Sequence, residues 1–336
     1  MSSGRRRWWL LQLIASVLVI GALIREVEPE QLATIPERLS LGWMLAALAL
    51  KVLTLAFHEM RTWLALPPPR PPLAQVTLIG FAAGILNLIL PARAGDVAVV
   101  VLLRRLCGVR TGVAAATMGI VSFLEAAVFG LLLLVVLLLG AAQWETIIGP
   151  DALDNAMRFV SLGTGGAIAV AVLVAVIGRL LAQGEEAEAP AGPGLLDMLR
   201  EAMTETGSAL SSPRYVLLNT SAALLQVIGM IAAFAMALPA VGVEVPMPAL
   251  AAAGVLALSS LASVALPAGY GAGPAAASAA VLSIFGVDPA GALAYAGAWW
   301  IISQVPATVI GIPCMLALDL KLGDFADPKP EAAQPG

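Results

Sequence analysis

Long runs of apolar residues recur along the chain and are separated by short polar segments. An α-helix needs about 20 predominantly apolar residues to cross the roughly 30 Å hydrocarbon core of a bilayer. Six runs predict full membrane spans on this basis, and they cover residues 10–24, 41–57, 112–142, 159–182, 215–238 and 290–318. The pattern therefore predicts an all-α, polytopic membrane protein.

Two further runs, 73–90 and 249–266, are followed by segments too short to cross the bilayer again. Each run ends in a break rich in Pro and Gly, and the segments beyond the breaks contain seven and thirteen residues. At 1.5 Å of rise per residue these segments extend only about 10 and 20 Å as helices. We therefore predict two re-entrant hairpins, each entering and leaving by one face, over about residues 73–106 and 249–286.

The distribution of Lys and Arg agrees with this topology. With six spans and two hairpins, 13 of the 18 basic residues fall on one side of the membrane and 3 on the other. Cytoplasmic loops carry an excess of Lys and Arg, so both termini are predicted to be cytoplasmic. The segment 58–72, which includes Arg61, is placed on the cytoplasmic side by the same count. Residues 1–322 are interpreted as a single transmembrane, lipid-transporter-like domain.

The composition agrees with a membrane protein and excludes several functional classes. Hydrophobic residues make up 60% of the chain, charged residues 12%, and the mean hydropathy is +0.93, which leaves too few polar residues to cover a water-soluble domain. A net charge of −4 argues against a nucleic-acid partner. One His and two Cys argue against a metal site or a disulfide framework. Neither a GxxxxGK(S/T) nor a Gly-rich dinucleotide motif is present, so we expect no cofactor and no ATP-driven transport by this chain alone.

The two predicted hairpins resemble each other in sequence. Leu-Pro-Ala occurs at 90–92 and at 266–268, and a Gly-Val pair follows at 108–109 and at 286–287. Because three predicted spans separate the hairpins, the second hairpin would be inverted relative to the first. Broken helices at corresponding positions of inverted halves point to the central binding site of a transporter.

Three charged residues lie deep in the predicted membrane domain, namely Arg93, Asp96 and Glu125. Each would cost about 2.5–3.5 kcal/mol at the bilayer centre unless it is paired or hydrated. Arg93 and Asp96 are three residues apart and share a face if their segment is helical. They either form a structural ion pair that closes the hairpin, or they bind and neutralise a lipid headgroup. Glu125 is a candidate for proton coupling.

Four uncharged residues complete the candidate substrate site near the membrane midplane. Asn87 is expected to satisfy backbone carbonyls freed by the Pro break, or to contact the ligand. Tyr270 and Gly271 lie in the Gly-rich tip of the second hairpin, where the backbone could approach a ligand closely. Gln304 lies in the last span, at the position that corresponds to Glu125 in the first half.

The polar residues of the second span and its end are predicted to lie at the membrane edge and not in the substrate site. Lys51 either extends its amine to the membrane edge or pairs with Glu59, and His58 is predicted to lie at the interface. None of the three is assigned to the site.

The polar segments outside the predicted spans are short. Residues 183–213 form a predicted cytoplasmic loop, and within it the apolar spacing of 195–210 predicts an amphipathic helix on the membrane surface. The polar tail at 323–336 is predicted to be disordered and cytoplasmic.

The residues around the first hairpin resemble a known family. The stretch 87–96 (NLILPARAGD), Leu102–Leu103, Gly108–Val109 and Glu125 are similar to the flippase-like family of the lysylphosphatidylglycerol synthase transmembrane region. The second Pro/Gly-rich element fits the same family, and the likeness extends over roughly residues 10–320. It implies a bacterial inner-membrane protein that translocates or handles amphiphilic lipids. A chain without an aminoacyl-transferase domain resembles the stand-alone members, which are linked to hopanoid, isoprenoid or glycolipid pathways.

Two departures from the family pattern bear on the substrate. The family usually has Glu where this chain has Asp96, and often has a further Arg where Val99 and Val100 stand here. The missing Arg favours a weakly charged or glycosylated lipid over a strongly anionic one.

Together these observations predict a transporter that flips an amphiphilic lipid such as a phospholipid, an isoprenoid or hopanoid, or a glycolipid. The expected partners are membrane lipids and the lipid substrate, with a second copy of the chain or lipid-biosynthesis enzymes as further partners. Two alternatives stay open. One is an intramembrane lipid-modifying transferase with Asp96 or Glu125 as its base, and the other is a non-transporting scaffold of a lipid-biosynthesis complex. The transferase would need a nucleophile and a donor-binding motif, which the sequence does not display, so we expect no enzyme activity.

Overall fold

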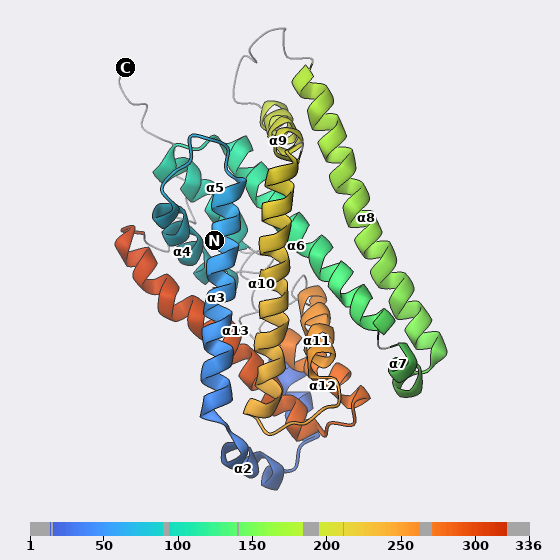
Figure 1. Cartoon of the computed structure of the whole chain (residues 1–336). Coiled ribbons are helices and arrows are strands. Elements are labelled where there is room, and N and C mark those ends of the chain that lie inside the picture. The colour runs from blue at the N-terminus through green and yellow to red at the C-terminus, as the bar shows by residue number, and fades with distance from the viewer. Residues whose placement is uncertain are drawn as a thin grey trace.

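A computed structural model of the chain describes residues 14, 16–89, 94–139, 141–183, 195–210, 212–262 and 271–320. Every regular element within these ranges is a helix (Figure 1). The all-α class predicted from the apolar pattern is therefore confirmed.

Five helices are long and apolar enough to cross a membrane. They are α3 (Leu41–Ala65), α6 (Thr111–Leu139), α8 (Pro150–Gln183), α10 (Pro213–Ala240) and α13 (Pro289–Ala317). The predicted first span, 10–24, lies only partly within the described residues, where Ser16–Arg25 forms a short apolar helix. These helices confirm a polytopic membrane protein.

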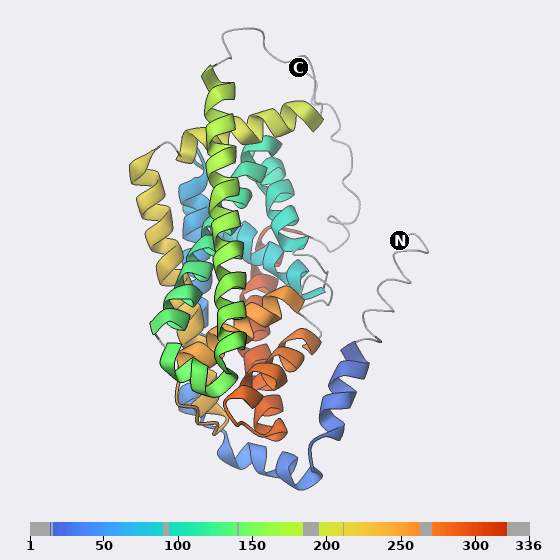
Figure 2. The ribbon, with the colours of Figure 1, turned by 90° about the vertical axis from the view of Figure 1, so that its right-hand side faces the viewer.

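The segments predicted as hairpins form two pairs of shorter helices at opposite ends of the bundle (Figures 1 and 2). The first pair is α4 (Leu73–Ile89) and α5 (Ala94–Cys107), and the second is α11 (Pro248–Ala262) and α12 (Ala272–Ile284). Their connections lie outside the described residues.

Both second arms end at a glycine in the left-handed conformation. Gly108 after α5 has φ 67° and Gly286 after α12 has φ 75°, a backbone conformation that favours Gly. The Gly-Val pairs noted in the sequence are thus helix terminators in both hairpins. The inverted relation of the two halves stays a prediction.

Three short helices complete the fold: α2 (Pro29–Arg38), α7 (Ala141–Ile148) and α9 (Leu195–Leu210). Helix α9 has the bounds predicted for the amphipathic segment, and it runs across one end of the bundle beside the end of α8 (Figure 2).

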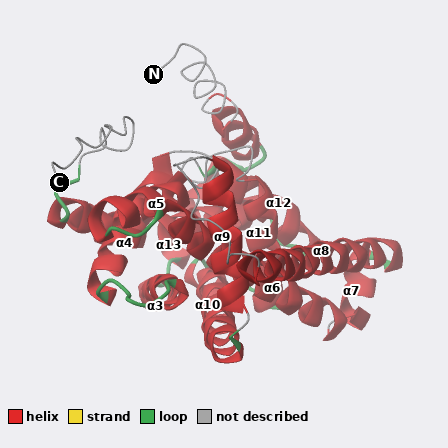
Figure 3. Ribbon diagram, turned by 90° about the horizontal axis from the view of Figure 1, so that it is seen from above, coloured by secondary structure: helices red, strands yellow, loops and turns green. Residues whose placement is uncertain are grey.

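The apolar core consists of two main clusters that share α13. One cluster joins α4 and α5 to the C-terminal end of α13, and the other joins α10, α11 and α12 to its N-terminal half. Viewed from above, α7 and α8 extend to one side of the bundle, opposite α4 and α5 (Figure 3). Only 6% of the most apolar window of α8 is buried, so this helix faces its surroundings over most of its length.

Candidate functional site

A polar cavity of about 250 Å³ lies inside the bundle, where α3, α4, α5, α6 and α10 meet. We call it the central cavity. Its polar and charged lining residues come from five helices and are Lys51, Thr54, His58, Glu59, Thr62, Asn87, Asp96, Glu125 and Gln226. Three of the predicted site residues, Asn87, Asp96 and Glu125, therefore lie around one space. Ionisable groups inside a membrane domain are rare and mark substrate or ion pathways.

Arg61 forms the centre of a hydrogen-bond network beside this cavity. Its side chain is fully buried, and its Nη1 donates to Glu125 Oε2 at 3.2 Å and to Gln226 Oε1 at 2.6 Å. Nη2 donates to the Val121 carbonyl at 2.6 Å, and Nε donates to Asn219 Oδ1 at 3.2 Å. A guanidinium can be buried at tolerable cost only when its donors are satisfied in this way.

The same network fixes the position of Glu125. Its Oε2 also accepts a hydrogen bond from Gln226 Nε2 at 2.9 Å and lies 3.4 Å from Nδ1 of His58. Glu125 is thereby held by side chains from α3 and α10, while one part of it lines the central cavity. Its charge is balanced by Arg61, so an ion pair joins α3 to α6 at this level and hydrogen bonds of Asn219 and Gln226 join both to α10.

The burial of Arg61 differs from what is expected of a residue in the predicted cytoplasmic segment 58–72. Helix α3 continues to Ala65, although the apolar run ends at Phe57. The helix stays inside the bundle because its polar residues find partners on α6 and α10. The charge bias counted from the sequence therefore includes one Arg that does not face the cytoplasm.

His58 and Lys51 also line the central cavity. The sequence predicts His58 at the membrane interface, and the structure places its ring beside Glu125 within the bundle. The Lys51 ammonium lies 5.9 Å from the centre of the Phe234 ring, a distance typical of a cation–π contact.

The first hairpin is closed by a contact between its two arms. The side-chain oxygen of Asn87 on α4 accepts a hydrogen bond from the Gly95 amide at 2.6 Å, so it satisfies one of the free amides at the start of α5. A β-carbon on Gly95 would lie 2.6 Å from the Ala83 carbonyl oxygen, so only glycine allows this approach. Asp96, in the first turn of α5, is placed at the positive end of the helix dipole.

Of the other predicted site residues, the two that the structure describes, Gly271 and Gln304, do not line the central cavity. Arg93 and Tyr270 lie outside the described residues, as does the predicted pairing of Arg93 with Asp96. Gly271 precedes α12 with φ 72° and lies against Trp300, which makes it a turn residue. Gln304 is buried on α13 but does not line the cavity, to which α13 contributes Ala307.

The residues of α3 and α10 that complete the site are not among those predicted from the sequence. A signal for them exists in the spacing of polar residues within otherwise apolar helices. On α3, Lys51 and His58 are seven residues apart, and on α10 Asn219 and Gln226 are also seven apart. Two helical turns place such residues on one face. Lys51, His58 and Gln226 line the cavity from this face, and Asn219 binds Arg61 beside it. Within the described residues, no group of three or more His, Cys, Asp or Glu side chains could hold a metal ion.

A protein-family model described as the lysylphosphatidylglycerol synthase TM region matches residues 9–311. The chain belongs to this family. The matched range contains both hairpins and all residues that line the central cavity, and it confirms the resemblance carried by the first hairpin. Neither the curated proteins nor the solved structures contain a significant match to the chain. Family membership makes this a multi-pass membrane protein of lipid biosynthesis or lipid handling.

Proposed function

We propose that this chain moves an amphiphilic lipid from one leaflet of the bilayer to the other. The observation that carries the proposal is the central cavity, a polar space lined by Lys51, Glu59, Asp96 and Glu125 within helices that are otherwise apolar. The candidate lipids are a phospholipid, an isoprenoid or hopanoid, and a glycolipid.

The physical difficulty in moving a lipid across a bilayer is the passage of its headgroup through hydrocarbon. A polar group without hydrogen-bond partners costs several kcal/mol there. The side chains around the cavity include carboxylates, an ammonium and amides. They offer a headgroup both negative and positive charges, and both hydrogen-bond donors and acceptors. The lipid tails would stay in the bilayer while only the headgroup passes these side chains.

The two alternatives fit the cavity less well. An intramembrane transferase needs a bound donor, and the sequence displays no donor-binding motif. A scaffold has no need for charged groups at depth, where each is costly. We therefore favour transport over catalysis, in a bacterial inner membrane with both termini in the cytoplasm. Lipid-biosynthesis enzymes would be partners that supply the lipid, and a second copy of the chain would be a partner in a homo-oligomer.

The test is a transport assay on the purified chain in phosphatidylcholine vesicles. The vesicles would carry fluorescent anionic, zwitterionic or glycosylated lipids in turn, and dithionite would quench only the outer leaflet. A lipid that the protein moves to the outer leaflet becomes accessible to dithionite. For at least one lipid, we therefore expect the protein to reduce the fluorescence that survives dithionite. Absence of movement for all three classes would contradict the proposal.

A matched pair of variants assigns the movement to the cavity. Asp96→Asn removes a cavity charge, while Asp151→Asn makes the same change at an exposed position in the first turn of α8. We expect Asp96→Asn to slow the movement at least tenfold and Asp151→Asn to leave it unchanged. Equal rates for the two variants would place the path elsewhere.

A further inference from the structure

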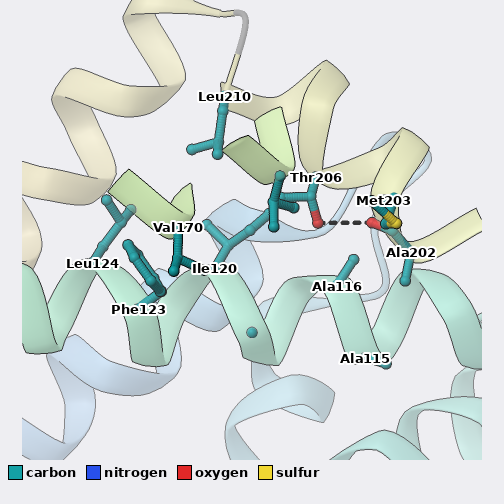
Figure 4. Close-up of a pocket in the computed structure, with 12 residues that line it drawn as sticks. Ala115, Ala116, Ile120, Phe123, Leu124, Val170, Ala202, Met203, Thr206 and Leu210 are labelled. Carbon is teal, nitrogen blue, oxygen red and sulfur yellow. Dashed lines mark hydrogen bonds between the residues drawn. The ribbon is translucent and has the colours of Figure 1, made fainter. Parts of the chain in front are cut away.

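A second cavity, of about 280 Å³, lies between α6, α8 and α9 (Figure 4). We call it the α9 groove. Its walls are almost wholly apolar, with Ile120 and Phe123 from α6, Val170 from α8 and Met203 from α9 pointing toward the space. No charged side chain is among the described residues that line it.

Small residues on α6 keep the groove open. Ala115, Ala116 and Gly119 form its floor, and a β-carbon on Gly119 would meet no atom within 4 Å. The hydroxyl of Thr206 donates to the Ala202 carbonyl within α9 at 2.7 Å (Figure 4). Because this hydroxyl is bonded within its own helix, the groove favours hydrocarbon.

A third cavity adjoins the groove and differs from it in chemistry. It has a volume of about 220 Å³, and it shares Ala116 and Ile120 with the groove. We call it the vestibule. It lies at the α9 end of the bundle, and its polar lining residues are Arg70, Thr117, Glu205, Ser208, Ser212 and Tyr215. The apolar groove thus adjoins a pocket that carries polar and charged side chains, at the end predicted to be cytoplasmic.

The vestibule is connected to the central cavity through side chains. The Tyr215 hydroxyl, in the vestibule wall, accepts a hydrogen bond from Asn219 Nδ2 at 3.5 Å. Asn219 in turn accepts from Arg61, which donates to Glu125 in the wall of the central cavity. This row of hydrogen-bonded side chains links the wall of the vestibule to the wall of the central cavity, and we call Arg61 and Asn219 the Arg61 partition.

We propose that the α9 groove and the vestibule together bind one lipid, with a hydrocarbon chain in the groove and the headgroup in the vestibule. The site would load lipid for transfer past the Arg61 partition into the central cavity, and this loading role rests on the proposed transport function. The adjoining apolar and polar spaces match the two parts of an amphiphile. Hydrocarbon also surrounds the outer wall of the groove, since α8 is of membrane-spanning length and mostly exposed.

Photo-crosslinking tests the binding site without requiring transport. The full chain would be reconstituted in phosphatidylcholine vesicles that contain phosphatidylcholine with a diazirine at the end of one acyl chain. After illumination, adducts would be mapped by mass spectrometry. We expect adducts concentrated on residues 115–124 and 202–210, well above the level on the exposed α10 residues Leu217 and Leu225.

A matched pair of Gly→Phe variants makes the result specific. Gly119→Phe fills the groove, whereas Gly163→Phe adds the same ring at an exposed position of α8 where a β-carbon meets no atom within 4 Å. We expect a severalfold loss of groove adducts in Gly119→Phe only. Adducts spread evenly over exposed apolar surfaces, an unchanged pattern in Gly119→Phe, or cross-linked protein dimers through α9 in place of lipid adducts would overturn the site.

The dithionite assay on the same variants separates binding from loading. Loss of adducts together with slower lipid movement in Gly119→Phe supports the loading role. Loss of adducts with unchanged movement overturns that role. If the wild-type chain moves no lipid, the proposed transport function and the loading role fail together, while the adduct map still decides whether the site binds lipid.

Discussion

The two hairpins have similar architecture and different chemistry. The first, α4 and α5, borders the central cavity with Asn87 and Asp96. The second, α11 and α12, packs into an apolar cluster with α10 and α13. Both consist of two short helices, and both second arms end at a left-handed glycine. Within the described residues, only the first hairpin brings a charged side chain to the cavity.

This difference shows that similar backbone elements need not contribute equally to a site. The charged partners of the first hairpin come from α3 and α6. The described polar residues of the second include Ser259 and Ser278, whose buried hydroxyls have no hydrogen-bond partner among the described residues. We infer that the first hairpin contacts the headgroup and that the second supports the bundle.

The largest effect is expected for Arg61→Ala, because it removes the fully buried partner of Glu125, which is itself 19% exposed, and with it four hydrogen bonds that join α3 to α6 and α10. Removing one member of a buried ion pair costs about 3–5 kcal/mol. We expect a large fall in unfolding temperature, measured by fluorescence-detected size-exclusion chromatography after heating. The double variant Arg61→Met with Glu125→Met should recover stability but not lipid movement. A single variant as stable as the wild type would contradict the network.

A smaller loss of stability is expected for Gly95→Ala in the first hairpin. The new methyl group would lie 2.6 Å from the Ala83 carbonyl oxygen, which forces α4 and α5 apart at a cost of about 1–3 kcal/mol. The counterpart is Gly254→Ala in α11, where the nearest atom is a Val281 methyl at 3.1 Å that can shift. Equal unfolding temperatures for the two variants would show that the two helices of the first hairpin are not packed more tightly at this glycine than those of the second.

Glu59→Gln tests transport rather than folding. Glu59 is buried and lines the central cavity, so the change keeps the shape of the side chain and removes its ability to ionise. We expect lipid movement to slow about tenfold, equivalent to about 1.4 kcal/mol, with little change in unfolding temperature. An unchanged rate of movement would exclude Glu59 from the path.

The smallest effect is expected for Ser278→Ala in the second hairpin. The Ser278 hydroxyl is buried and has no partner among the described residues, so its removal breaks no hydrogen bond. We expect stability within about 0.5 kcal/mol of the wild type and an unchanged rate of lipid movement. A transport defect in this variant would show that the second hairpin contacts the substrate.

The sequence predicts the helices well where the signal is local. Apolar run length predicts the long helices, the Pro/Gly breaks predict the two short pairs, and apolar spacing predicts α9 at 195–210. Asp96 and Glu125 stand out because a charge within an apolar run is costly wherever the helix packs.

The residues that complete the site depend on contacts between distant segments. Arg61 follows the end of an apolar run and is typical of a helix flank when only its neighbours are considered. Its burial depends on Asn219 and Gln226, which lie more than 150 residues further along the chain. Conversely, Gln304 was selected for its place in the repeat, but packing places it away from the cavity.

The central claim is that the headgroup passes through the central cavity, and blocking that cavity tests it most directly. Gly84 lines the cavity and Gly297 lies exposed on α13, and a β-carbon at either position meets no atom within 4 Å. The measurement is the rate of lipid movement in vesicles for Gly84→Phe and Gly297→Phe, at matched amounts of folded protein. We predict that Gly84→Phe abolishes movement and Gly297→Phe retains the wild-type rate. Wild-type movement in Gly84→Phe would contradict the account.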